Sequence, residues 1–442
     1  MDAKQFREAA FRYAQKAGCQ GAELVESRSK DFSVGVLKGQ VDTYTVCRTL
    51  NLSLRVQLDG KNGYATTEAA ENPEALVDAA LDNARAVGSE DIHPMAGPAQ
   101  YPVVAAPADA LMGMGEVEKI DLCKALEAAT LAQDPRVKRV STCRVVTAEG
   151  EVHLHNTLGL EAHREERISC ILVNAILEDG AEVHDGGAFR ARGESLDLTG
   201  CAREAVEEAA MQFGGKPVAP GRYPILLRND AAYSLLSAFS GMFSADAAQK
   251  GLSLLAGREG SAIASPLLTI WDDPLYSLNP MAFDDEGVPA RRKKVVEEGR
   301  LLTLLHNLKT ARKAGVPSTG NGGRGSGGIG VSPSNFYIQP GEGSLNSLMK
   351  KLGTGLLITE LSGLHAGVNA LSGEFSLLCK GQLVEGGKIA RPVAYITLGG
   401  SFLELLQGVQ HIGGDLRFSL PSGSCFGSPS LCLAPLAVSG QG

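Results

Sequence analysis

The first ninety residues change from a helical to a strand pattern and back. Apolar residues at helical spacing predict a helix over residues 2–17, with Gly18 as its C-cap. Every second residue is apolar over residues 50–58, which predicts a half-exposed strand that ends at an Asp59-Gly60 turn. Asn72-Pro73 predicts the N-cap and first position of another helix. This region is therefore expected to contain a helix, antiparallel strands and a second helix.

A similar succession follows further along the chain. Residues 116–133 and 196–213 have helical spacing, and residues 138–190 between them read as long antiparallel strands with a turn at 148–150. Beyond residue 217, one helical stretch near 231–243 is followed by many short apolar runs punctuated by glycine. Strands with segregated helices, and no regular βαβ alternation, predict an α+β fold.

Proline and glycine mark the expected boundaries. The proline-rich stretch before residue 116 predicts a connector draped over the surface, and the Gly214-Gly215-Lys216-Pro217 segment predicts a domain boundary. We expect an N-terminal domain of helix plus antiparallel sheet and a largely antiparallel, β-rich C-terminal domain. The expected regions are 1–90 (N-terminal α+β), 91–115 (connector), 116–213 (central α+β) and 214–442 (C-terminal).

Composition narrows the classes of function. The 442 residues include 44% hydrophobic and 21% charged residues, which predicts a chain that mostly folds, and 53 glycines, which predict many tight turns. A formal charge of −8 gives no basic face for nucleic acid. No apolar run is long enough for a membrane span, and the start lacks the apolar core of a secretory signal. The nine cysteines are scattered without a CxxC pair, which favours reduced thiols and a cytoplasmic protein.

Two motifs resemble ligand-binding sites, but a simpler structural interpretation is preferred for each. Residues 325–330 spell G-x-G-x-x-G, yet Pro333 follows and no helix is expected after it, so a surface loop is favoured over a dinucleotide site. His153 and His155 share one face of an expected strand, where His163 or His184 from a neighbouring strand could complete a zinc site. An exposed polar strand face is the preferred interpretation.

Three C-terminal segments carry a family resemblance: LLHNLKTARKAGVPSTGN (304–321), GLLITELSGLHAGVNALSGEFS (355–376) and GSPSLCL (427–433). Together with LRVQLDGKNGYATTE (54–68) and VHLHNTLGLEAHRE (152–166), they resemble the TldD/PmbA family, also called modulators of DNA gyrase and regarded as peptide-maturing metallopeptidases. The matches are collinear over nearly the whole chain.

The resemblance also implies which branch of the family this chain is similar to. TldD-like members have H-E-x-x-x-H on a helix, with a distal cysteine as third zinc ligand, whereas PmbA-like members, also called TldE, lack these groups and pair with a TldD subunit. In the matching register, Ser237 and Met242 occupy the histidine positions and Ala238 the glutamate position. Cys425 lies too close to the GSPS segment to correspond to the cysteine ligand. The resemblance therefore implies no catalytic residue and no metal in this chain, with zinc in a TldD-like partner.

A role as a PmbA/TldE-like subunit follows as an expectation. Such a subunit would close a chamber around the partner's active site and present edge strands to unfolded peptides, as a heterodimer with a TldD-like chain or as a homodimer. Peptide contacts are expected at Ser318, Thr319, Gly320 and Asn321, with Arg324 close by. Two alternatives stay open: an active peptidase that uses His153, His155 and a third ligand, or a gyrase-associated regulatory binding protein.

Overall fold

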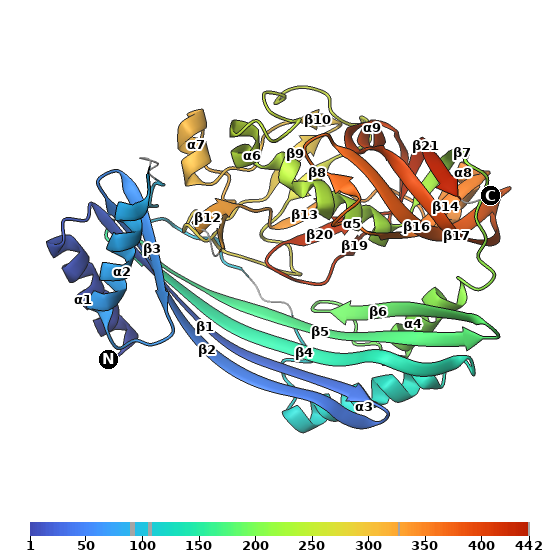
Figure 1. Cartoon of the computed structure of the whole chain (residues 1–442), viewed down its shortest axis with the longest axis horizontal. Helices are drawn as coiled ribbons and strands as arrows, with labels where there is room; N and C mark the ends of the chain where they lie inside the picture. Colours follow the sequence, from blue (N-terminus) through green and yellow to red (C-terminus); the bar gives the residue numbers. More distant parts are fainter. Residues whose placement is uncertain (89–92, 105–107, 326–327, 441–442) are drawn as a thin grey trace.

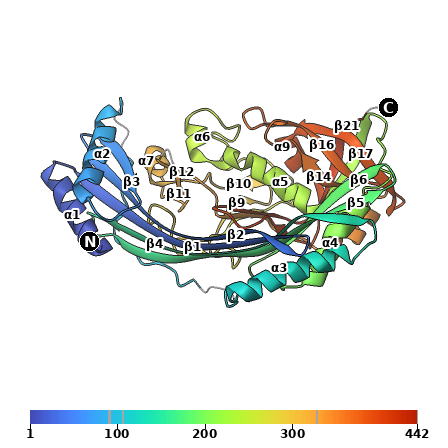
Figure 2. The same cartoon turned by 60° about the horizontal axis from the view of Figure 1, so that its bottom comes forward.

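The protein consists of a long curved sheet with the C-terminal region on its concave side (Figures 1 and 2). The computed structural model describes residues 1–88, 93–104, 108–325 and 328–440. Helices lie at both ends of the long sheet, and the sheets of the C-terminal region are mostly antiparallel. The expected α+β class with a β-rich C-terminal region is confirmed.

The long sheet has the strand order β3-β2-β1-β4-β5-β6 and is antiparallel throughout. Its central pair joins β1 to β4, so the first ninety residues and residues 116–213 share one sheet. Alternate residues of each strand face opposite sides. The strands are β1 (Gly21–Leu37), β2 (Gln40–Leu58), β3 (Lys61–Thr67), β4 (Val137–Asn156), β5 (Glu161–Asp179) and β6 (Glu182–Ala191).

Four helices cover the two ends of one face of this sheet, which we call the outer face. At one end, α1 (Ala3–Lys16) and α2 (Pro73–Ala86) bury Leu24 and Leu54. At the other end, α3 (Glu116–Leu131) and α4 (Leu198–Ala210) bury Val34 and Val145. The opposite, inner face carries Val25 and Leu154, which pack against Phe283 of the C-terminal region. In the part of the chain that the structure describes, the middle of the outer face has no helix over it (Figure 1).

Glycine allows a helix to approach the sheet closely at each end. A Cβ on Gly63 of β3 would lie 1.8 Å from the carbonyl oxygen of Ala80 in α2. A Cβ on Gly186 of β6 would lie 2.3 Å from the carbonyl oxygen of Ala205 in α4. Any side chain at these positions would push the helix away from the strand, so part of the glycine surplus serves packing rather than turns.

The C-terminal region contains two larger sheets and a hairpin. One sheet has the order β14-β7-β21-β17-β16-β15 with β18 paired to β21, and the other the order β10-β9-β8-β13-β20-β19. Pairing is antiparallel except for β14 with β7 and β13 with β20. The strands are β7 (Gly221–Leu227), β8 (Ile270–Asp272), β9 (Lys293–Glu297), β10 (Arg300–Leu301), β11 (Gly322–Gly325), β12 (Gly328–Val331), β13 (Asn335–Ile338), β14 (Gly355–Ser362), β15 (Val368–Asn369), β16 (Glu374–Glu385), β17 (Lys388–Ser401), β18 (Val409–Ile412), β19 (Arg417–Phe418), β20 (Cys425–Ser428) and β21 (Leu431–Gly440).

Short helices complete the C-terminal region. Phe239 and Met242 belong to its main hydrophobic core, together with Ile225, Phe336 and Leu356 from the strands. No helix in the described part of the chain is long and apolar enough to cross a membrane. The helices are α5 (Asn229–Phe239), η1 (Ser240–Phe243), α6 (Ala245–Gln249), α7 (Leu308–Ala314), α8 (Leu345–Leu352) and α9 (Phe402–Gln407).

Most elements expected from periodicity are present. The helices expected at 2–17, 116–133 and 196–213 are α1, α3 and α4. Asn72 caps α2 by accepting a hydrogen bond from the backbone N–H of Ala75 at 3.0 Å. Asp59 and Gly60 have φ angles of 48° and 75°, as a two-residue hairpin turn of type I′ requires.

The turn expected at residues 148–150 is wrong. Strand β4 continues through it, with Gly150 paired to Ser29 of β1 and to Glu166 of β5. The three residues that suggested a turn, Ala148, Glu149 and Gly150, instead lie on a strand with neighbours on both sides. Tertiary pairing here overrides the local turn preference.

The connector is also more buried than expected. Residues 93–96 lie between the long sheet and the C-terminal region: His93 is 4% exposed, and the Asn156 side chain donates to the carbonyl of Ala96 at 2.8 Å. Residues 97–100 and Val103 are exposed, so only part of the connector leaves the surface. Tyr101 donates to the carbonyl of Gly287 at 3.1 Å. Residues 89–92 and 105–107 lie outside the described residues.

The G-x-G-x-x-G segment forms a hairpin rather than the expected loop. Gly325 ends β11 and residues 328–330 belong to β12, whereas Ser326 and Gly327 lie outside the described residues. Strand β13 comes next along the chain, not a helix. The helix N-terminus that would hold a pyrophosphate is therefore missing from the described structure that follows the motif.

Candidate functional site

A cleft of about 550 Å³ lies between the inner face of the long sheet and the C-terminal region. The sheet contributes mainly small polar and apolar side chains, among them Ser27, Ser53 and Val152, and two charged ones, Arg164 and Glu166. The C-terminal region contributes residues 284–285, 320–325, 332–334 and parts of two further loops. The cleft is open and polar, which suits a main chain better than a compact apolar ligand.

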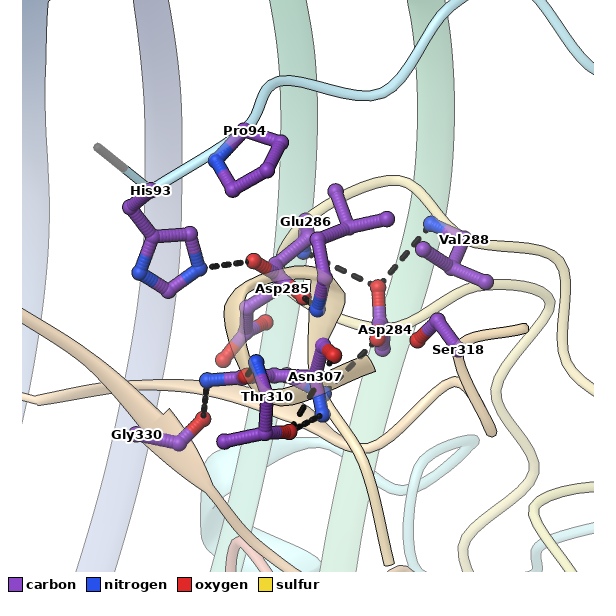
Figure 3. Close-up of polar contacts among 12 residues, drawn as sticks. His93, Pro94, Asp284, Asp285, Glu286, Val288, Asn307, Thr310, Ser318 and Gly330 are labelled. Carbon is purple, nitrogen blue, oxygen red and sulfur yellow. Dashed lines mark hydrogen bonds and ion pairs between the residues drawn. The ribbon is translucent and has the colours of Figure 1, made fainter. Parts of the chain in front are cut away.

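Three consecutive acidic residues, Asp284, Asp285 and Glu286, organise the C-terminal wall of the cleft (Figure 3). Asp284 accepts hydrogen bonds from the backbone N–H groups of Val288 at 2.9 Å and Gly322 at 2.7 Å. Glu286 accepts one from the backbone N–H of Leu308, the first residue of α7, at 2.7 Å. This acidic segment therefore fixes its own turn, the β11–β12 hairpin and the start of a helix.

The carboxyl groups of the acidic segment have pKa values that are shifted in opposite directions. Burial, together with the mutual repulsion of Asp284 and Glu286, raises the pKa of Asp284 to about 7, and burial raises the pKa of Glu286 to about 7. The two interact and titrate as a pair. Although burial opposes ionisation of Asp285 too, Arg164 and the Arg324 backbone N–H hold the pKa of Asp285 below its usual value. One fixed negative charge thus stands between two carboxyls that titrate near neutrality.

His93 of the connector contacts Glu286 (Figure 3). Burial and then the nearby Arg55 lower the pKa of His93 to about 3, so its imidazole is neutral at physiological pH. The contact is therefore a hydrogen bond in which the imidazole N–H donates to an ionised Glu286, or the protonated Glu286 donates to the ring nitrogen. This bond joins the connector to the acidic segment.

A buried ion-pair network connects the long sheet to the β11–β12 hairpin. Glu23 of β1, with no exposed surface, accepts a hydrogen bond from Arg55 of β2 at 3.0 Å and one from Arg324 of β11 at 2.8 Å. Arg324 also donates to the carbonyl oxygen of Asp285 at 3.2 Å. Its Nε and Nη1 have no hydrogen-bond partner among the described residues, although both are buried. Arg324 lines the cleft, and a ligand there would reach these two donors only after the guanidinium rotates, because both atoms are buried.

Arg164 of β5 forms a second link across the cleft. Its guanidinium donates to Asp285 Oδ1 at 2.6 Å and to the carbonyl oxygen of Phe283 at 3.0 Å, and lies 5.1 Å from the Phe283 ring centroid. Glu166 also pairs with Arg164, at 2.8 Å. Together with the ion-pair network around Glu23, this contact joins the two walls of the cleft by buried polar interactions.

The five residues expected to contact peptide divide into two groups. Gly320, Asn321 and Arg324 line the cleft, whereas Ser318 and Thr319 do not. Ser318 and Thr319 donate to the carbonyl oxygen of His306 at 3.1 and 3.0 Å and thereby hold the loop in place. Asn321 donates to the buried carboxylate of Asp272 at 2.8 Å.

The H-E-x-x-x-H register falls on a helix end that is packed into the core. Ser237 and Ala238 belong to α5, and both are half-buried. Met242 lies in η1, is 1% exposed and belongs to the main core. A thioether inside an apolar core and a hydroxyl do not form a zinc site, because both are weak zinc ligands. The residues at these positions therefore do not fit the metal that the motif would hold.

The histidines of the long sheet have different neighbours. His153 of β4 and His163 of β5 are directly paired and stack with ring centroids 4.4 Å apart, whereas His155 turns toward α1 and His184 pairs with Glu182 on β6. All lie in the long sheet, and His153 and His163 are on its outer face, away from the cleft. The expected polar strand face is partly exposed: His153 is half-buried and His163 exposed.

Sequence reasoning did not single out Glu23, Arg55, His93, Arg164 or the acidic segment 284–286. A detectable signal existed for the last of these, because three acidic residues followed by glycine stand in an otherwise apolar stretch. Glu23 and Arg164 gave no such signal, because each looks like an ordinary polar position on a strand.

Family models match three consecutive parts of the chain. They are the PmbA/TldA metallopeptidase domain 1 at residues 22–84, the central domain at 114–213 and the C-terminal domain at 220–440. The chain belongs to the PmbA/TldD family. The matches cover both walls of the cleft, so the cleft is built from the parts of the chain that define the family.

Curated relatives and solved structures agree with the family. The chain is 28% identical to the metalloprotease PmbA of Escherichia coli O157:H7 over 95% of its own length and 92% of that protein. It is 31% identical to the metalloprotease TldD homologue of Buchnera aphidicola from Acyrthosiphon pisum, over 54% of this chain and 52% of the relative.

Among solved structures, a protein from Thermotoga maritima named as a candidate modulator of a DNA gyrase is 34% identical, with a TM-score of 0.91 over 99% of this chain and all of that one. TldE from Thermococcus kodakarensis shares the fold, with a TM-score of 0.90 at 23% identity over 98% of this chain and 100% of that one.

Proposed function

We propose that this chain is a PmbA/TldE-like, non-catalytic subunit of a cytoplasmic zinc-dependent peptidase that cleaves and matures unfolded peptides. Its own task is to hold the peptide as an extended chain in the cleft. Catalytic zinc belongs to a TldD-like partner, with which it forms a heterodimer. A homodimer of this chain is the alternative assembly.

The observation that carries the proposal is an open polar cleft in a chain that has no zinc-binding groups at residues 237–242. Ser237, Ala238 and Met242 offer neither an imidazole nor a carboxylate, and Met242 is buried in the core. The cleft nevertheless carries buried, unsatisfied donors on Arg324. A chain that binds peptide without cleaving it would combine these two features.

Strand pairing supplies the means of binding without sequence selectivity. Strand β3 pairs with β2 only over residues 52–58, so residues 40–51 of β2 have one side unpaired among the described residues. Asn51, at the start of this free edge, lines the cleft. An extended peptide that leaves the cleft can therefore continue along β2 by main-chain hydrogen bonds, which every sequence offers.

Arg324 provides the polar contact inside the cleft. Its buried Nε–H and Nη1–H groups would donate to peptide carbonyl oxygens or to a terminal carboxylate. Satisfying buried donors contributes about 1–3 kcal/mol each, because they are otherwise desolvated without a partner. Arg164 is fully engaged by Asp285, Glu166 and Phe283 and would shape the cleft rather than bind.

The decisive experiment mixes this chain with the TldD-like chain of the same genome. We expect a stable heterodimer by size-exclusion chromatography with light scattering, catalytic zinc in the TldD-like chain only, and cleavage of an unfolded peptide only by the mixture. Stoichiometric zinc together with cleavage by the lone chain would favour the active-peptidase alternative. Recovery of gyrase without a TldD-like chain would favour the regulatory alternative.

A binding experiment tests the cleft directly. A fluorescein-labelled unstructured peptide of about 20 residues should bind the lone chain, as followed by anisotropy. We expect Arg324→Gln to weaken binding by about tenfold, the equivalent of about 1.4 kcal/mol. Arg203→Gln is the matched control, because Arg203 is an exposed arginine on α4, away from the cleft. Equal weakening by both variants would mean that the peptide responds to net charge alone.

A further inference from the structure

The outer face of the long sheet carries a second group of chemically reactive side chains, on the side away from the cleft. Between the α1–α2 pair and the α3–α4 pair, no helix among the described residues covers this face (Figure 1). Glu151 and His153 of β4 and His163 of β5 lie there. Strand alternation puts their neighbours Val152, Leu154 and Ala162 on the inner face, where they pack with Phe283.

The geometry of the group is set by strand register. His153 and His163 are directly opposite each other in the β4–β5 pair, and Glu151 is two residues before His153, on the same face. The two imidazole rings are nearly parallel, with an angle of 22° between them and centroids 4.4 Å apart. Glu151 Oε2 lies 3.7 Å from Nε2 of His153. One potential ligand atom from each residue lies within 4.8 Å of the other two.

We propose that Glu151, His153 and His163 bind a divalent transition-metal ion, with Zn²⁺ as the best-suited ion, at a site separate from the peptidase chemistry. Two imidazole nitrogens and one carboxylate oxygen are a zinc donor set, and water completes a tetrahedron. Ligands 2.0–2.2 Å from an ion are roughly 3.3–3.5 Å apart in a tetrahedron. The three ligand atoms lie within 4.8 Å of one another, so the side chains must rotate to reach that spacing.

The other histidines of the sheet do not join the site. His155 faces α1, and its Nδ1 is buried without a hydrogen-bond partner among the described residues. Burial lowers the pKa of His155 to about 4. His184 is engaged by Glu182 at 3.0 Å and packs edge-on against Phe213. The sequence suggested a zinc site of His153, His155 and either His163 or His184. The site proposed here keeps His153 and His163, leaves out His155 and adds Glu151.

The position of the site determines what a bound ion does. It joins neighbouring strands β4 and β5 directly behind Val152 and Arg164, which line the cleft on the other face. An ion held there stabilises the pairing of these two strands and thereby the sheet wall of the cleft. It cannot reach a peptide in the cleft, because the sheet lies between them.

The experiment measures metal binding to tag-free protein in a Cys47→Ser background, which removes the exposed thiol of Cys47 as a competing ligand. Isothermal titration with Zn²⁺ should give one site per chain. His163→Asn and Glu151→Gln should each weaken Zn²⁺ binding by at least about tenfold, because even the removal of an outer-shell partner can weaken binding by this much. His184→Asn removes a histidine that also has a carboxylate partner and should leave the affinity unchanged.

A spectroscopic measurement identifies the ligands. Cu²⁺, which such sites bind more tightly than Zn²⁺, should give an electron paramagnetic resonance spectrum with coupling to two nitrogens in the Cys47→Ser protein and to one in His163→Asn. Melting temperatures without metal check that the variants are folded. No Zn²⁺ binding by the parent protein, or binding that survives both substitutions, would overturn the proposal.

Discussion

Glu23 and Arg324 are 301 positions apart in the sequence, yet Nη2 of Arg324 donates a hydrogen bond of 2.8 Å to Oε1 of Glu23. The carboxylate has no exposed surface, and its other oxygen accepts from Arg55 at 3.0 Å. One buried carboxylate thus pairs with two guanidinium groups, one from the long sheet and one from the hairpin that closes the cleft.

Substitution of Glu23 should therefore be strongly destabilising. Glu23→Gln removes the negative charge and leaves Arg55 buried without a hydrogen-bonded carboxylate, for which we expect a loss of about 3–5 kcal/mol in the free energy of unfolding. Urea denaturation measures it. Glu26→Gln, three residues along the same strand and on the outer face, is the control and should cost less than about 1 kcal/mol. A loss of less than about 1 kcal/mol for Glu23→Gln would mean that water reaches this ion-pair network.

The acidic segment should make stability depend on pH near neutrality. Burial raises the pKa of both Asp284 and Glu286 to about 7, above the usual values of unfolded chains. The folded protein then binds more protons than the unfolded chain between about pH 4 and 7, so this contribution to stability is present at low pH and is lost as the pH rises through 7. Each proton gives a slope of up to about 1.4 kcal/mol per pH unit.

Glu286→Gln tests this pH dependence. Its amide can still accept from the Leu308 N–H and donate to the His93 ring, but it cannot ionise. We expect the fall in unfolding free energy between pH 6 and 8 to be smaller in this variant than in the parent protein. The window includes the titration of His93 in the unfolded chain near pH 6.5, which acts with the opposite sign. His93 is present in both proteins, so this effect is common to the two slopes. Glu360→Gln, at a half-exposed carboxylate, is the control, and an unchanged slope in Glu286→Gln would contradict the prediction.

The positions that align with the zinc motif should respond as structural residues. Met242 is 1% exposed within the main core, so Met242→Ala should lower the free energy of unfolding by about 2–5 kcal/mol. Ser237→Ala, on the half-buried side of α5, should change it by less than about 1 kcal/mol. Thermal and urea denaturation measure both. A mild effect of Met242→Ala would indicate a loosely packed helix end.

Local patterns were sufficient to predict the helices and much of the antiparallel sheet. Periodicity located α1, α3 and α4, and Asn72-Pro73 marked the start of α2, because capping and amphipathic spacing are local properties. The turn expected at 148–150 was wrong for the complementary reason. Gly150 lies in β4 because β1 and β5 pair with it on both sides, and pairing between distant segments leaves no mark on the local sequence.

The cleft contains some of the residues that the sequence singled out, and their contact with a peptide stays a prediction. Gly320, Asn321 and Arg324 were expected near a ligand and do line the cleft. Their partners Glu23 and Arg164 could not be identified, because a buried ion pair between distant residues depends on topology that periodicity does not encode. The same limit applies to His93, which the proline-rich connector suggested would be exposed and which is buried against Glu286.

The free edge of β2 should determine how an extended peptide binds. Successive residues of a strand point their N–H groups to opposite sides, so of Thr45→Pro and Val46→Pro, one removes a hydrogen bond to β1 and the other removes a donor from the free edge. We expect the first to lower the melting temperature, and the second to weaken binding of the labelled peptide severalfold with little change in melting temperature. Val183→Pro and His184→Pro, on β6 at the opposite edge of the same sheet, should leave peptide binding unchanged. If both β2 variants fold and bind as tightly as the parent protein, peptide pairing must use another edge.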